Sequence, residues 1–193
     1  MRKIKISWVQ ILWSIASLIM FGAAVLSLAT WNKSMTTIAV PLGVAMFMVG
    51  WINLFVYHHN YKKIHGCRWV LADGMCTTLL SVFLLFNRMI EPDIIPFFFG
   101  VWELFTGILK TLDSRELKEE NYRGVKRFAI AGAVELISGI AALLKPIDEF
   151  VGMHGVVAFV LFIQGCGFIF KVLIYHDIVL DKEGEKEEIL SAR

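Results

Sequence analysis

Two glutamates stand inside long apolar stretches of the sequence, where acidic side chains are rare. Glu103 lies in GVWELFTGILKTL, and Glu135 lies in IAGAVELISGIAALLKP. A charge that faces lipid near the middle of a span costs roughly 2.5 kcal/mol or more, so we expect both side chains to point into the protein. Three further polar candidates within apolar stretches are Asp73, Asn53 and Gln164.

Two interpretations of the glutamates stay open. In the first, Glu103 and Glu135 take up and release protons along an interior path, and the chain is a small proton-coupled transporter or channel. In the second, each carboxyl is protonated or bonded to a neighbour such as Asn53, Gln164 or Thr77, and it fixes the packing of the helices. The second is favoured, because no other motif indicates transport.

Three other charged residues have simpler explanations. Asp73 lies a few residues from Arg68, so a local ion pair or a side chain that reaches the membrane surface explains it best. Lys110 and Lys171 fall at predicted span ends. Long basic side chains at such places usually extend toward the headgroups, so we expect both lysines to orient their spans.

The sequence predicts no enzyme. It contains no nucleophile elbow, phosphate loop or zincin motif, so we expect no catalytic residues and no cofactor. His58, His59, His65 and Cys67 follow no standard metal spacing, and we expect no metal site. The three cysteines form no CxxC motif, which indicates reduced side chains. A net charge of +2 is too small to indicate a nucleic-acid partner.

These residues must be positioned by membrane helices. The chain has 193 residues, of which 57% are hydrophobic, and a mean hydropathy of +0.65. Its apolar runs approach or exceed the ~20 residues that a spanning helix needs, and they lack the alternation of a barrel strand. The sequence therefore predicts an all-α membrane protein. The predicted spans are 7–30, 35–57, 69–87, 93–112, 127–145 and 150–175.

The basic residues predict the orientation of these spans. Of the 19 Lys and Arg residues, 16 lie at the two termini or in the second and fourth connections, and the other three lie on the opposite side. The positive-inside rule then places both termini in the cytoplasm. We expect a multi-pass protein of a bacterial inner (plasma) membrane, with the three short connections outside.

Small residues recur seven positions apart in all six predicted spans. The pattern shifts by 57 residues from the first pair of spans to the second, and by 58 from the second to the third. Seven residues return to nearly the same helix face, so each pair forms a shallow groove where another backbone can approach closely. These residues are Ser17 and Ala24, Gly43 and Gly50, Gly74 and Ser81, Gly100 and Gly107, Gly132 and Gly139, and Ala158 and Gly165.

The repeat predicts three helical hairpins that enter the membrane from the same side, arranged as parallel repeats. We expect one six-helix domain over 1–180, with units of about 7–62, 67–120 and 125–178. Residues 181–193 form a charged tail, which we expect in the cytoplasm. The lipid bilayer is the expected partner. A homo-oligomer and contacts with other membrane proteins are open alternatives, because grooves of small residues also serve association between chains.

The stretch GAVELISGIAALLKP at 132–146 resembles the first-helix pattern of the HdeD family, small six-span bacterial membrane proteins associated with acid resistance. GVWELFTGILKTL at 100–112 resembles the second-helix pattern of that family. The similarity covers roughly residues 10–175, and the first unit departs most, with Ser17 and Ala24 in place of glycines. The resemblance implies a role in acid or envelope stress tolerance, and it brings no established catalytic residues. Because the sequence also contains no enzyme motif, we expect that role to be non-enzymatic.

Overall fold

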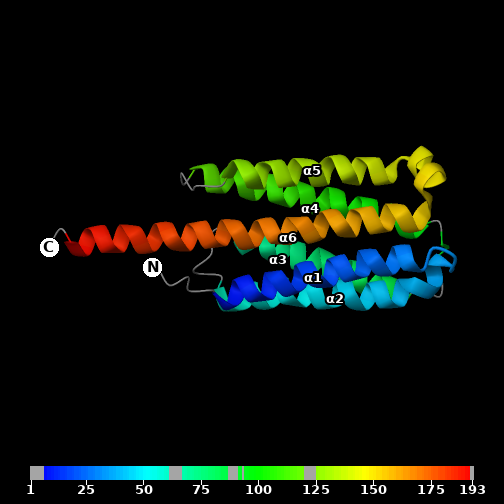
Figure 1. Ribbon diagram of the computed structural model, residues 1–193, viewed down its shortest axis with the longest axis horizontal. Coiled ribbons are helices and arrows are strands. Elements are labelled where there is room, and N and C mark those ends of the chain that lie inside the picture. The colour runs from blue at the N-terminus through cyan, green and yellow to red at the C-terminus, as the bar shows by residue number, and fades with distance from the viewer. Residues whose placement is uncertain (1–6, 61–66, 87–90, 93, 120–124, 192–193) are drawn as a thin grey trace.

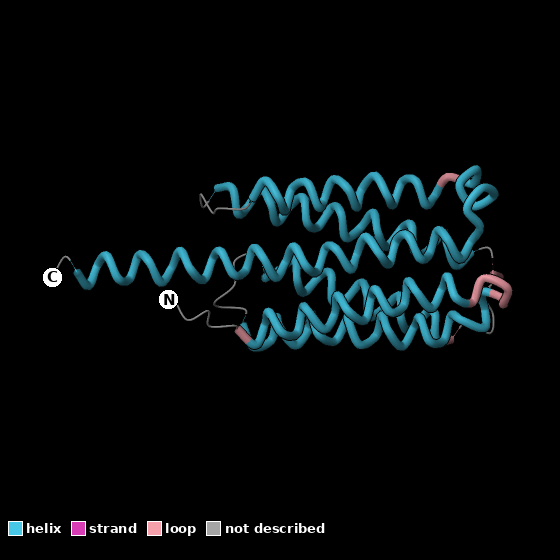
Figure 2. The backbone as a smooth tube through the Cα atoms, viewed as in Figure 1, coloured by secondary structure: helices cyan, strands magenta, loops and turns pink. Residues whose placement is uncertain are grey.

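The computed structural model describes residues 7–60, 67–86, 91–92, 94–119 and 125–191 (Figure 1). Within these ranges the side chains of residues 67, 119, 145–150 and 176–191 are not described. The described residues form six α-helices and no strand, as the tube in Figure 2 shows, so the all-α prediction is confirmed. The helices are α1 (Trp8–Ala29), α2 (Met35–Asn60), α3 (Cys67–Leu85), α4 (Ile94–Glu119), α5 (Val125–Leu143) and α6 (Lys145–Ser191).

Five of these helices are long and apolar enough to cross a membrane. The exception among the described residues is α5, which carries the charged residues Lys126, Arg127 and Glu135 within its 19 residues. Large apolar side chains also face outward from the bundle: the exposed fractions of Leu18 and Ile137 are 72% and 68%. Lipid satisfies such a surface, and water does not. The structure is therefore that of an integral membrane protein.

The helices run alongside one another, and their ends define two faces of the bundle (Figure 1). We call the end where α1 begins and α6 ends the terminus end. The opposite end, where α1 leads into α2 and α5 leads into α6, is the turn end. Helix α6 continues beyond the other helices at the terminus end, and it includes most of the tail that begins at residue 181.

The most extensive helix contacts join α2 to α3, α4 to α5, and α6 to α1. They do not lie between the two helices of one predicted hairpin: α1 and α2, α3 and α4, and α5 and α6 contact each other less. Because α6 packs on α1, these contacts bring the last helix against the first and close the bundle into a ring.

Small residues let the backbones approach closely where α4 meets α5. A Cβ atom added to Gly107 would lie 2.8 Å from the backbone nitrogen of Leu136 and 3.1 Å from the carbonyl oxygen of Gly132. A Cβ atom on Gly139 would lie 2.7 Å from the nitrogen of Leu104. Real Cβ contacts are longer, so a side chain at either glycine would push the two helices apart.

Similar close approaches occur at the other two large interfaces. Between α2 and α3, a Cβ atom on Gly50 would lie 2.9 Å from the backbone nitrogen of Thr78 and 3.2 Å from the carbonyl oxygen of Gly74. Between α1 and α6, the hydroxyl of Ser17 donates a 2.8 Å hydrogen bond to the carbonyl oxygen of Gly165. At least one small residue of the seven-residue pattern thus lies at a close helix contact in each of the three interfaces.

Gly152 breaks the helical path of α6 near the turn end. Its φ of 73° and ψ of 156° lie outside the helical region, in a conformation that side-chain-bearing residues rarely adopt. The ring of Trp31, from the connection between α1 and α2, lies directly against this glycine. The break lets α6 begin a new straight segment that runs to the terminus end.

Candidate functional site

Asp73 and Lys171 form an ion pair between α3 and α6, with 2.6 Å between Oδ2 and Nζ. Both side chains are buried. The amide of Asn53 donates a 3.1 Å hydrogen bond to the same Asp73 oxygen, and the indole N–H of Trp13 donates to Asn53 at 3.2 Å. The expected pairing of Asp73 with Arg68 is wrong, because Arg68 is exposed and Asp73 faces the interior.

Lys110 and Glu135 form a second buried ion pair, between α4 and α5. The expectation that Lys110 and Lys171 extend toward the membrane surface is therefore wrong: each reaches inward to a carboxylate. Gly167 on α6 leaves the room for the second pair, because a Cβ atom there would collide with both the Lys110 amino group and the Glu135 carboxylate. Gly167 lies outside the seven-residue pattern of small residues, so nothing in the sequence marks it.

Among the described residues, Glu103 has polar partners and no cation in hydrogen-bonding contact. Ser138 donates a 2.8 Å hydrogen bond to its Oε1, and the amide of Gln164 donates a 2.7 Å hydrogen bond to its Oε2. Gln164 also bonds to the hydroxyl of Thr106. Gln164 was one of the partners that the sequence suggested for a glutamate, and Thr77 was another, but Thr77 instead accepts a 3.0 Å hydrogen bond from Trp102.

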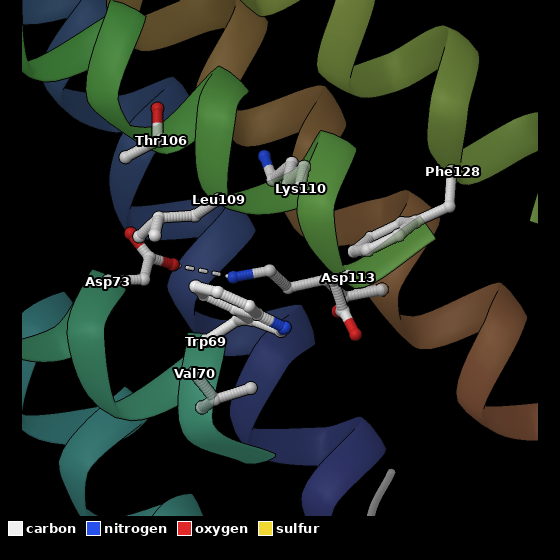
Figure 3. Close-up of a pocket in the computed structure, with 9 residues that line it drawn as sticks. Trp69, Val70, Asp73, Thr106, Leu109, Lys110, Asp113 and Phe128 are labelled. Carbon is white, nitrogen blue, oxygen red and sulfur yellow. Dashed lines mark hydrogen bonds and ion pairs between the residues drawn. The ribbon is translucent and has the colours of Figure 1, made fainter. Parts of the chain in front are cut away.

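Asp113 lines a small interior cavity near the terminus end (Figure 3). The cavity measures about 10 Å³, and its walls come from α3, α4, α5 and α6. The dashed line in Figure 3 marks the Asp73–Lys171 pair. Asp113 is buried, and its Oδ1 accepts no hydrogen bond. The cavity-lining residues are Trp69, Val70, Asp73, Thr106, Leu109, Lys110, Asp113, Phe128 and Lys171.

The buried carboxylates and lysines make up what we call the ionisable cluster. The described spans bury four carboxylates and two lysines, so two carboxylates are left without a lysine partner. Carboxylates and ammonium groups lose hydration when they are buried, which is why two of the acids and both lysines are paired. The members are Asp73, Glu103, Lys110, Asp113, Glu135 and Lys171.

The interior on the turn side of Glu103 is apolar. Among its described residues this apolar half contains no buried carboxylate or lysine. Leu42, Leu84, Ile95 and Phe99 are each 0% exposed. Such side chains offer water no polar group, and the buried polar side chains on this side of Glu103 are Ser27, Ser81 and His154 among the described residues. A mainly apolar layer therefore lies between the ionisable cluster and the turn end.

His154 is the buried titratable side chain at the turn end of the described bundle. Its carbonyl oxygen accepts a 2.9 Å hydrogen bond from Ser27, and its ring lies 6.1 Å from the ring of Trp31, between centroids. The ring nitrogen Nε2 has no hydrogen-bond partner. A histidine near a span end is usually solvated, but this side chain is only 8% exposed.

The described histidines and the larger hollow of the bundle lie apart from the ionisable cluster. The described side chains contain no group of three His, Cys, Asp or Glu residues with metal-ligand geometry. A larger hollow of about 310 Å³ lies between α3 and α4, but its lining is apolar and includes Phe83, Phe98 and Trp102. His58 and His59 are exposed. His65 and the side chain of Cys67 lie outside the described residues.

Comparisons of the chain with family models, with curated proteins and with solved structures returned no match.

Proposed function

We propose that the chain is a membrane protein of the HdeD type, which contributes to acid or envelope stress tolerance without enzymatic activity. The observation that carries this proposal is the division of the interior. Six ionisable side chains are held within the bundle, and the packed apolar half separates them from the turn end. A protein with this interior holds titratable groups inside the membrane without opening a water-filled path across it.

The proposal includes an arrangement in a bacterial inner membrane with both termini in the cytoplasm. Three parallel-repeat hairpins then place the ionisable cluster nearer to the cytoplasm and the apolar half nearer to the outside. The close approaches at Gly107, Gly50 and Gly165 support this repeat, because related positions of the three units serve the three large interfaces. External acid then meets the hydrophobic layer first.

Acid survival of bacterial cells tests the stress role. Cells that lack the protein are compared with cells that express the wild type, Gly107→Leu or Gly22→Ala. Gly107→Leu forces α4 and α5 apart, whereas a Cβ atom on Gly22 meets nothing within 4 Å. We expect protection by the wild type and Gly22→Ala, and no protection by Gly107→Leu. Equal survival of all four strains would overturn the proposed role.

A second candidate function is a small proton-coupled transporter or channel that uses Glu103 and Glu135. The observation in its favour is an unsatisfied acceptor in the membrane interior: Oε2 of Glu135 has no hydrogen-bond partner, although Lys110 contacts the other oxygen. Proton flux that depends on Glu103 and Glu135 would establish this candidate. The apolar half argues against it, because protons need bound water or polar groups to move.

A further inference from the structure

Two buried polar atoms without partners line the same cavity. The indole N–H of Trp69 is a donor with no acceptor, and Oδ1 of Asp113 is an acceptor with no donor. In the view of Figure 3 the indole nitrogen points toward Asp113. A buried donor or acceptor without a partner has lost its hydrogen bonds to water and gained none in the protein, which is unfavourable. A molecule that both accepts from Trp69 and donates to Asp113 would satisfy the two groups together.

The size and chemistry of the cavity select that molecule. Its volume of about 10 Å³ is close to the space that one water molecule occupies. An organic ligand is too large. The amino groups of Lys110 and Lys171 and the inward N–H of Trp69 disfavour a metal cation. A single water molecule both fits the space and has the required donor and acceptor.

The cavity lies close to the terminus end of the bundle. Asp113 is followed within one turn of α4 by exposed Arg115 and Glu116, and Trp69 is preceded by exposed Arg68. The cavity therefore lies within about one helical turn, or ~5 Å, of charged groups at the terminus end. From the cavity toward the turn end, the interior holds first the rest of the ionisable cluster and then the apolar half.

We propose that this cavity is a binding site for one water molecule, through which Asp113 exchanges protons with the solution at the terminus end. A proton from that solution joins the water, and the water then gives one proton to Oδ1 of Asp113. One O–H bond forms on the carboxyl, one breaks on the hydronium, and neutral water remains. The charged groups around Asp113 are Asp73 on α3, Lys110 and Glu116 on α4, and Lys171 on α6, and α5 contributes the apolar ring of Phe128.

The six tryptophan indole N–H groups provide the first test, in protein labelled with ¹⁵N-tryptophan and reconstituted in lipid. Trp13 and Trp102 donate to Asn53 and Thr77, so their N–H groups are internal references. We expect the Trp69 N–H to show magnetisation transfer from water, and to exchange with D₂O about tenfold or more faster than either reference. Exchange as slow as that of Trp13, without a water signal, would overturn the water site.

Infrared spectroscopy of oriented vesicles tests the proton route. Acid at the terminus end should increase the absorption of protonated carboxyl groups more in the wild type than in Asp113→Asn, because exposed carboxyl groups contribute equally to both proteins. Acid at the turn end should give the same absorption in both proteins. Asp113→Asn should keep the Trp69 water signal, because the amide oxygen still accepts a hydrogen bond. Asp113→Glu should restore the larger increase, and Glu116→Gln is the matched control on the exposed face.

Equal increases in the wild type and Asp113→Asn, or a difference between the two that follows acid at the turn end, would overturn the proton route. Unchanged slow exchange of Trp13 and Trp102 shows that each variant is folded. The inference goes beyond the proposed stress role and does not depend on it: the site would stand if acid survival were unaffected, and the stress role would stand if the cavity were dry.

Discussion

The two halves of this interior are stabilised by different interactions. Towards the terminus end, Asp73, Glu135 and their lysine partners are held in pairs between different helices. Towards the turn end, buried side chains such as Leu42 and Phe99 need no specific partner. The first half is specified by charge and geometry, and the second by volume. Mutations should therefore act by different rules in the two halves.

The largest effect is expected from breaking an ion pair in the ionisable cluster. Lys110→Met leaves the carboxylate of Glu135 buried, and no other hydrogen-bond partner of that carboxylate is described. Loss of one partner of a buried pair typically costs about 3–5 kcal/mol. Reversible unfolding in mixed detergent micelles would measure this free energy. A loss below about 1 kcal/mol would mean that the pair is hydrated or absent in the membrane.

Truncation in the apolar half should follow the cavity left behind. Leu42→Ala removes a fully buried side chain, and such changes typically cost about 2–5 kcal/mol. Leu42→Met nearly preserves the volume and should cost less than about 1.5 kcal/mol. The same unfolding measurement applies. If the two variants were equally unstable, volume would not be what specifies this half.

The helix interfaces should respond to a single added methyl group. Gly107→Ala and Gly139→Ala place a Cβ atom against the backbone of α5 or α4, so we expect destabilisation of about 1–3 kcal/mol. Gly22→Ala is the matched control, because its Cβ atom meets nothing, and alanine in a helix is favoured by about 0.5–1 kcal/mol. Equal effects at the three sites would contradict the close helix approach.

Replacing an ion pair as a unit should cost little. The double variant Lys110→Met with Glu135→Leu removes both charges and keeps apolar volume, and such exchanges are often neutral or stabilising. We expect an unfolding free energy within about 1 kcal/mol of the wild type. A double variant as unstable as Lys110→Met alone would show that the ion pair itself stabilises the fold. It would contradict the expectation that only an unpaired buried charge is destabilising.

A modest effect is also expected at Glu103. Glu103→Gln keeps one acceptor for Ser138 or Gln164 and leaves the other donor without its acceptor. The loss of one such hydrogen bond costs about 1 kcal/mol. A thermal shift assay in lipid nanodiscs should show a modest decrease in Tm. A loss as large as that of Lys110→Met would mean that Glu103 holds a charge on which the packing depends.

The fold and the inward orientation of the glutamates follow from local patterns. Apolar length predicts helices, and the cost of a charge that faces lipid predicts that Glu103 and Glu135 face the interior, where they are 0% and 1% exposed. The seven-residue spacing also marked the residues that lie at the close helix contacts. These features depend on one helix at a time, so a single sequence contains them.

The pairings could not be predicted in this way. Lys171 and Asp73 are 98 residues apart, and nothing near either residue indicates the other. Both lysines were assigned to the membrane surface because that is the usual place for a lysine at a span end. Asp113 and Trp69 were missed as a site for the same reason: each has an ordinary local explanation, and only the packing of α3 against α4 and α6 brings them to one cavity.

Proton flux into proteoliposomes under an imposed pH gradient tests the division of the interior most directly. The wild type is compared with Glu103→Gln, Glu135→Gln and empty liposomes. Because the apolar half closes the path from the ionisable cluster to the turn end, we predict flux no greater than that of empty liposomes for all three proteins. Flux above that level, lost in either glutamine variant, would show a continuous proton path across the bundle and would contradict this account.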